Sequence, residues 1–221
     1  MTKALSPEKR IAVFVAAIAA IVGGVLLTNA IPPVVGLGDK VRLPIFHGGS
    51  TWVNLGAFTL LGLFALSYLL TGRRDLYRWA VGFRVVAGSL WITNTVMGMI
   101  AAMQTWDFTG SAQSPLVVAQ ADPRLVVQVQ LLLLIVGVFV LDWLLESDRW
   151  KASLDVGYVA VMWWLLGTVL SSPEASALHP DNPVLNSGSE IQLPFFAILG
   201  ALSLGVILFA WLVRDRMLRA E

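Results

Sequence analysis

The sequence predicts an all-α protein that crosses a membrane six times. Of its 221 residues, 57% are hydrophobic and only 13% are charged, and the mean hydropathy is +0.77. Soluble domains carry about 25% charged residues. Apolar runs long enough to cross a hydrocarbon core as helices fall at 11–28, 51–70, 79–103, 124–146, 153–171 and 191–213. They account for most of the chain, so we expect residues 1–221 to form one six-helix transmembrane domain.

The first apolar run has a signal peptide as its alternative interpretation. Thr28, Asn29 and Ala30 follow it and resemble a weak cleavage site. The run is long for a signal peptide, however. We therefore expect a retained helix.

The later helices begin after short polar segments or at capping residues. A Ser or Thr can cap a helix through its hydroxyl, and Asp followed by Pro is a common helix start. These starts fall at Ser50 or Thr51 for the second helix, after 71–78 for the third, at Asp122 and Pro123 for the fourth, and after 147–151 for the fifth. The external connections are longer, and functional residues concentrate in such loops.

Basic residues in the loops and tails predict the orientation. Eleven fall on the side of the two termini, namely Lys3, Lys9, Arg10, Arg73, Arg74, Arg78, Arg149, Lys151, Arg214, Arg216 and Arg219. Only Lys40, Arg42 and Arg124 fall on the other side. The sequence thus predicts a multi-pass protein of the cell inner membrane with both termini cytoplasmic.

Several kinds of chemistry find no support in the sequence. The chain has no cysteine, so it has no disulfide and no thiolate metal site. No nucleophile stands with a base, which argues against a hydrolase and makes an enzyme the less favoured interpretation. No basic, aromatic-studded surface indicates nucleic acid, and no duplicated halves or broken helices indicate a transporter.

The two histidines of the chain, His47 and His179, both come just before apolar segments on the predicted external face. A catalytic zinc site usually needs three protein ligands, whereas a haem iron needs two axial ligands. The pair therefore points to haem, with His47 and His179 as ligands of the iron. The alternative is that each histidine is an interfacial residue bonded to water or backbone.

Residues near the external loops offer further contacts for a porphyrin. Trp106 and Phe108 have flat apolar faces for stacking, and Arg124, with Lys40 and Arg42, is able to pair with propionates. Each also has a simpler explanation. A tryptophan at a bilayer surface commonly belongs to the aromatic belt, and the segment around Arg124 also makes a plain helix start.

The arrangement resembles the CcmC branch of the CcsA-type cytochrome c biogenesis proteins, which handle haem in membranes. The resemblance spans roughly 40–213. It is carried by six spans, by His47-x-x-x-x-Trp52 before the second helix, by His179 before the sixth, and by Asp122-Pro-Arg124-Leu125, which match the last four positions of a Trp-Asp-x-Arg-Leu run. It implies haem b held at the external face by both histidines, with Trp52, Trp106 and Asp122 at the site, and a haem chaperone or a larger membrane complex as partner.

The family's external loop is dense in tryptophan, whereas the loop after the third helix here holds only Trp106, and Ala121 stands where the last tryptophan is expected. This departure supports an alternative function, a non-catalytic transmembrane subunit of a respiratory or photosynthetic complex derived from the same fold. The discriminating feature is whether His47 and His179 converge on one iron.

Two predictions concern charges and polar groups at membrane depth. Arg84 in the third helix and Asp142 in the fourth fall at similar depth, so we expect an ion pair between them, with Asp155 as a competing partner. Thr93, Asn94 and Thr95 in the third helix are expected to bond Gln128 and Gln130 in the fourth.

Overall fold

A computed structural model of the protein describes residues 4–106, 113–171, 184 and 187–220. Six long helices dominate the described residues, which include no β-strand: α1 (Pro7–Leu27), α2 (Arg42–Thr71), α3 (Arg74–Thr105), α5 (Pro123–Leu144), α6 (Asp148–Leu170) and α7 (Ser189–Ala220). A short helix, α4 (Pro115–Gln120), precedes α5, and two 3-10 turns, Thr28–Ala30 and Asp39–Val41, lie between α1 and α2. By length and composition all six long helices are able to cross a membrane. The predicted all-α, six-span fold is confirmed.

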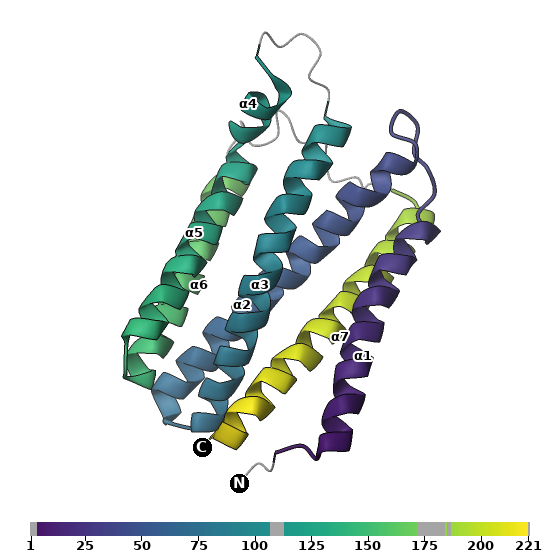
Figure 1. Ribbon diagram of the computed structural model, residues 1–221. Coiled ribbons are helices and arrows are strands. Elements are labelled where there is room, and N and C mark those ends of the chain that lie inside the picture. Colours follow the sequence, from purple (N-terminus) through teal and green to yellow (C-terminus); the bar gives the residue numbers. More distant parts are fainter. Residues whose placement is uncertain (1–3, 107–112, 172–183, 185–186, 221) are drawn as a thin grey trace.

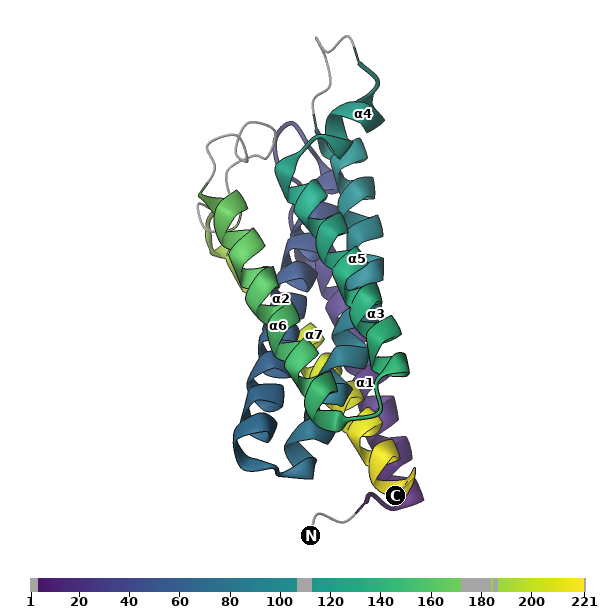
Figure 2. The same cartoon turned by 90° about the vertical axis from the view of Figure 1, so that its left-hand side faces the viewer.

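The six helices stand in three pairs (Figures 1 and 2). α1 packs on α7, α2 on α3, and α5 on α6. The α2–α3 pair lies in the middle, since α3 contacts α7 on one side and α5 on the other, while α2 contacts α6 and α7. Both chain ends lie at one end of the bundle, called here the terminal end, and α4 lies at the opposite end, called the α4 end.

The second helix begins earlier than the sequence predicts. It starts at Arg42 rather than at residue 51, directly after the 3-10 turn. Pro44 is accommodated because it lies in the first helical turn, where backbone N–H groups have no helical partner. His47 is therefore a helix residue and not a loop residue, and the expected cap at Ser50 or Thr51 is wrong.

The expected start of α5 agrees with the structure, whereas α3 begins at Arg74 and α6 at Asp148, inside the segments 71–78 and 147–151 that were expected to be loops. Asp122 caps α5, its Oδ1 accepting hydrogen bonds from the backbone N–H groups of Arg124 (2.9 Å) and Leu125 (3.2 Å), and Pro123 is the first helical residue. Gly72 ends α2 in the left-handed conformation, with a φ of 70° that glycine adopts without steric cost. A two-residue link, Gly72 and Arg73, thus separates α2 from α3.

A cluster of charged groups joins α3, α5 and α6 towards the terminal end. Arg84 on α3 lies 2.7 Å from a carboxylate oxygen of Asp142 on α5 and 3.4 Å from one of Asp155 on α6. Lys151 approaches Asp142 to 3.9 Å. The predicted Arg84–Asp142 pair is confirmed, and Asp155 is a second partner rather than a competitor.

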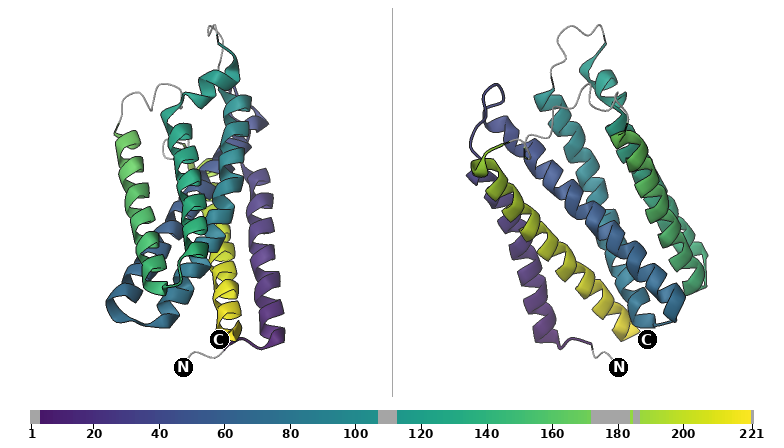
Figure 3. Two further views of the ribbon diagram at one scale, coloured as in Figure 1. Left: turned by 60° about the vertical axis from the view of Figure 1, so that its left-hand side comes forward. Right: turned by 180° about the vertical axis from the view of Figure 1, so that it is seen from behind.

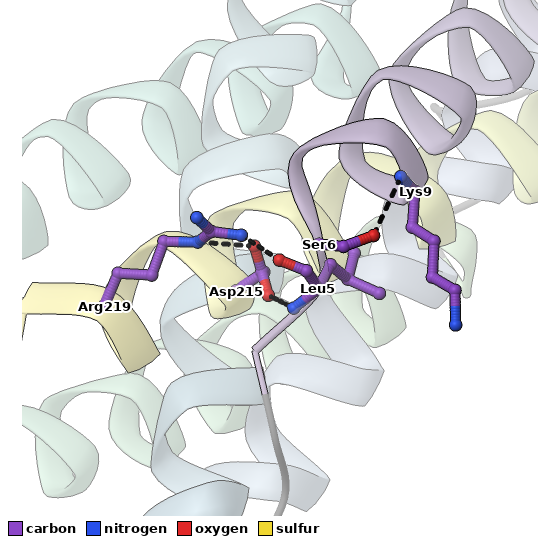
Figure 4. A network of polar contacts seen from close by, with 5 residues as sticks. All are labelled: Leu5, Ser6, Lys9, Asp215 and Arg219. Carbon is purple, nitrogen blue, oxygen red and sulfur yellow. Dashed lines mark hydrogen bonds and ion pairs between the residues drawn. The ribbon is translucent and has the colours of Figure 1, made fainter.

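The segment before α1 is fastened to α7 at the terminal end (Figure 4). The Leu5 backbone N–H donates to Oδ1 of Asp215 at 2.5 Å, and the Arg219 guanidinium bonds both the Leu5 carbonyl and Oδ2 of Asp215. Asp215 is almost fully buried, with 1% of its surface exposed. We call this contact the terminal latch.

Candidate functional site

His47 lies within the bundle near the α4 end, on the face of α2 that meets α3. Its Nδ1 is 3.1 Å from Oδ1 of Asn94 on α3. The hydroxyls of Ser50 and Thr51, one turn further along α2, donate to the His47 carbonyl at 2.9 and 2.8 Å. The side chain thus projects from a well-bonded helical turn into the α2–α3 interface.

The hydrogen bonds of Asn94 indicate which ring nitrogen of His47 is protonated. The Nδ2 of Asn94 donates to the Thr51 hydroxyl at 2.8 Å, and its Oδ1 is also 2.5 Å from the Ser50 hydroxyl. Oδ1 is therefore the acceptor facing His47, and Nδ1 is the donor. In this tautomer Nε2 carries the lone pair, which is the form of histidine that ligates a metal.

Gly98 on α3 and Gln128 on α5 face the other edge of the imidazole. A Cβ added at Gly98 would lie 2.8 Å from Cε1 of His47, 3.0 Å from its Nε2, and 3.0 Å from Oε1 of Gln128. Real Cβ contacts essentially never fall below 3.0 Å. The ring therefore fills the notch that Gly98 leaves in α3, so it approaches the α3 backbone more closely than any other residue type at 98 would allow.

Gln128 closes this polar cluster from the side of α5. It is 6% exposed, its backbone carbonyl accepts from the Trp91 indole N–H at 2.9 Å, and its buried Nε2 lacks a hydrogen-bond partner within the described part of the chain. We name the group formed by His47, Asn94, Gly98 and Gln128 the His47 cluster. An unbonded amide N–H next to a histidine is costly at this depth.

The chemistry of the donor set fits one axial position of a haem, but the space around the ring does not yet admit a porphyrin. The imidazole is oriented through Nδ1, as second-shell bonds orient metal-ligating histidines. Its Nε2 edge is packed against Gly98 and Gln128. Binding of a haem iron by Nε2 would require either that the imidazole move away from α3 or that the Gln128 side chain withdraw.

The structure places the aromatic candidates away from this ring edge. Trp52 is five residues beyond His47, on another face of α2; it is 54% exposed and lines an apolar groove of about 510 Å³ with Phe83 and Leu199. Trp106 ends α3 and packs with Met99 on a separate small core formed by Ala102, Ala119 and Leu125.

The polar candidates lie at the start of α5. Asp122 is fully buried, and its Oδ2 has no hydrogen-bond partner in the described ranges. Arg124, two residues later, is half-buried, and its Nε is likewise without one there. These orphaned atoms show that the beginning of α5 has unsatisfied hydrogen-bonding capacity at the α4 end.

Two of the predicted site residues, Phe108 and His179, lie outside the described residues, so the structure gives no separation between the two histidines. Within the ranges that it does describe, no three His, Cys, Asp or Glu side chains gather to hold a metal ion.

Asn94 is the site residue that the sequence assigned to the wrong neighbour. It was expected to bond the fourth helix, but it bonds His47, Ser50 and Thr51 on α2. Thr95 bonds the Trp91 carbonyl of its own helix. The spacing of Asn94 and Gly98 by one helical turn was the sequence feature that put them on one face.

Comparison with known proteins adds no relative. No family model matches this chain, and none of the curated proteins with which it was compared matches it. The function must therefore be argued from the geometry of the His47 cluster and from the sequence, and what both establish is a multi-pass, six-helix membrane protein.

Proposed function

We propose that this protein binds and handles haem b at the α4 end of the bundle, in the manner that its resemblance to the CcmC-like proteins implies. His47 is one axial ligand in this proposal and His179 is the other. The observation that carries it is the bond from Nδ1 of His47 to Asn94, because it fixes the tautomer whose Nε2 is able to ligate iron.

Gly98 and Gln128 suit a histidine that binds the haem iron reversibly. In the structure the imidazole rests in the Gly98 notch beside Gln128. When bound, haem would offer its iron as the partner of Nε2. Asn94 holds the proton on Nδ1, and movement of the imidazole or of Gln128 opens the space at Nε2. A side chain with a resting position as well as a liganding position is what a protein that takes up and releases haem requires.

The guanidinium at the start of α5 fits the propionate edge of the same group. Arg124 has an Nε without a hydrogen-bond partner among the described residues, and a propionate is an acceptor that it would bind through a charge-assisted bond. Trp106 contributes the apolar surface next to it on the end of α3. We further expect the inner membrane as the location, with the α4 end external.

An absorption spectrum of the detergent-solubilised protein, oxidised and then reduced with dithionite, tests the proposal. We expect a Soret band and sharpened reduced bands after haem is supplied, lost or shifted in His47→Ala and in His179→Ala. Asn94→Leu should shift the bands while retaining haem, since it frees the imidazole from its orienting bond. Trp143→Phe, at an exposed position near the end of α5 and far from the α4 end, is the matched control and should leave the spectrum unchanged.

A second candidate, a non-catalytic subunit of a larger membrane complex, is favoured by one observation. The His47 ring is already hydrogen-bonded by Asn94 and packed into the Gly98 notch, which is what a purely structural histidine needs. A spectrum without a chromophore after haem is supplied, in a protein whose helical circular dichroism is intact, would reject haem handling and favour this function.

A further inference from the structure

At the terminal end, an apolar groove opens between α1, α3 and α7. Its volume is about 450 Å³, within the range of ligand sites in proteins, about 300–1,000 Å³. Apart from one serine and one arginine its lining is apolar: Phe14 from α1, Val85, Val86, Ser89 and Leu90 from α3, and Phe209, Leu212, Val213 and Arg216 from α7.

The groove exists because α1 and α7 spread apart towards the terminal end (Figures 1 and 3). Nearer the α4 end they are in close contact, where a Cβ added at Gly205 would lie 2.6 Å from Ile21 and 3.3 Å from the Ala17 carbonyl oxygen. Further down, Phe14 and Phe209 meet edge to face with their centroids 6.1 Å apart. Phe14 is half exposed, so the groove is open to the surrounding membrane.

One guanidinium group lines this groove, and a second lies one helical turn from a lining residue. Arg216 lines it, and neither an ion pair nor a side-chain hydrogen bond joins Arg216 to any described residue. Arg10 lies one turn, about 6 Å, before Phe14 on the same face of α1, and its side chain also lacks such a partner in that part of the chain. Both residues are exposed and lie close to the terminal end of their helices.

The neighbouring cations contrast with these two. Arg214 lies 2.6 Å from Asp75 and over the Trp79 ring, and Arg219 is held in the terminal latch. The cations on either side of Arg216 are thus paired, Arg214 with Asp75 of α3 and Arg219 with Asp215 of α7, whereas Arg216 lines the groove without a partner among the described residues. An apolar groove that opens to lipid and ends at unpaired positive charge complements a molecule with a hydrocarbon chain and an anionic head.

We propose that this groove binds one anionic phospholipid, with an acyl chain between α1, α3 and α7 and its phosphate on Arg216 and Arg10. The occupant is a membrane lipid rather than a free phosphate, because most of the lining is hydrocarbon. A basic residue near an anionic membrane surface is worth about 1 kcal/mol, which is about a fivefold change in affinity.

Native mass spectrometry of the detergent-solubilised full chain, titrated with dioleoyl phosphatidylglycerol or dioleoyl phosphatidylcholine, tests the proposal. We expect one tightly held phosphatidylglycerol and much weaker binding of phosphatidylcholine, with inorganic phosphate unable to displace the lipid. Arg216→Gln should weaken phosphatidylglycerol binding about fivefold, and Arg10→Gln/Arg216→Gln about 25-fold if the two charges act additively.

Two further variants separate the groove from the general surface charge. Arg73→Gln/Arg74→Gln removes the same charge at the start of α3 and should leave the affinity unchanged. Ser89→Trp fills the groove from an exposed position of α3 and should lower the binding of both lipids. Equal affinity for the two lipids, or an equal loss in both double variants, would overturn the proposal. A third outcome would also overturn it: if the unaltered protein forms a dimer, and Arg10→Gln/Arg216→Gln abolishes that dimer without changing the lipid affinity, a second copy of the chain occupies the groove.

Discussion

Replacing Arg84 by glutamine should destabilise the protein more than neutralising either of its carboxylate partners. Arg84 is 2% exposed and Asp155 is 0% exposed, whereas the Asp142 side chain is 27% exposed. In Arg84→Gln, Asp142 still has Lys151 at 3.9 Å, but Asp155 is left buried with no cation. Leaving one buried charge without its partner costs about 3–5 kcal/mol.

The single aspartate variants retain part of the cluster, so they should cost less. Asp155→Asn leaves Arg84 paired with Asp142 at 2.7 Å and removes the more buried of the two negative charges. We expect a loss of about 1–3 kcal/mol, the value for a disturbed buried hydrogen-bonding group. Arg84→Gln/Asp155→Asn removes the orphaned charge together with its partner, so it should be more stable than Arg84→Gln alone.

Unfolding of the purified variants in one detergent, followed by tryptophan fluorescence and circular dichroism, measures these differences. Arg73→Gln is the matched control, because it removes an exposed arginine two residues beyond α2 and should change the free energy of unfolding by no more than about 0.5 kcal/mol. If Arg84→Gln behaves like Arg73→Gln, or if the double variant is less stable than Arg84→Gln, the assignment of Arg84 as the counter-ion of Asp155 is refuted.

Two further variants test the helix packing and the terminal latch. In Gly82→Ala the new Cβ would lie 2.5 Å from the Ala210 carbonyl oxygen on α7, so thermal unfolding should show a loss of stability of about 1–3 kcal/mol. The control is Gly137→Ala, whose Cβ meets nothing within 4 Å and which should be neutral or slightly stabilising. Equal behaviour of the two variants would contradict a close crossing of α3 and α7. Asp215→Ala removes the acceptor of the Leu5 N–H and should speed limited proteolysis before α1 roughly tenfold, because a charge-assisted hydrogen bond contributes about 1.5 kcal/mol. An unchanged cleavage rate would mean that the terminal latch does not hold this segment.

The number and approximate place of the helices could be predicted because hydropathy and length alone decide them in a membrane. The Arg84–Asp142 pair was predictable for a related reason: two opposite charges at the same depth of adjacent antiparallel helices have few other partners. The first residue of α2 could not be predicted in this way. Polar residues such as Arg42 and His47 interrupt the apolar run, yet the helix continues through them into the interfacial region.

The candidate site was predictable in composition but not in its contacts. The sequence singled out His47, but it could not show that Asn94 faces α2 rather than the fourth helix, because that depends on which helices are neighbours and how they are rotated. Nor could it show the role of Gly98, whose meaning comes from the ring packed against it. The roles of Trp52, Trp106, Asp122 and Arg124 towards haem remain predictions for the spectra described above.

The pairing of α1 with α7 sets the order in which the protein is completed in the cell. Leu5 and Asp215 are 210 positions apart in the chain, and α1 packs chiefly on α7. At a synthesis rate of about 5–20 residues per second, the last helix emerges from the ribosome roughly 10–40 s after the first. During that interval α1 lacks α7, the helix on which it chiefly packs, so we expect it to remain in lipid or beside the insertion machinery. Contact between α1 and α7 is therefore a late event of biosynthesis, and the apolar groove between them forms only after α7 has been made.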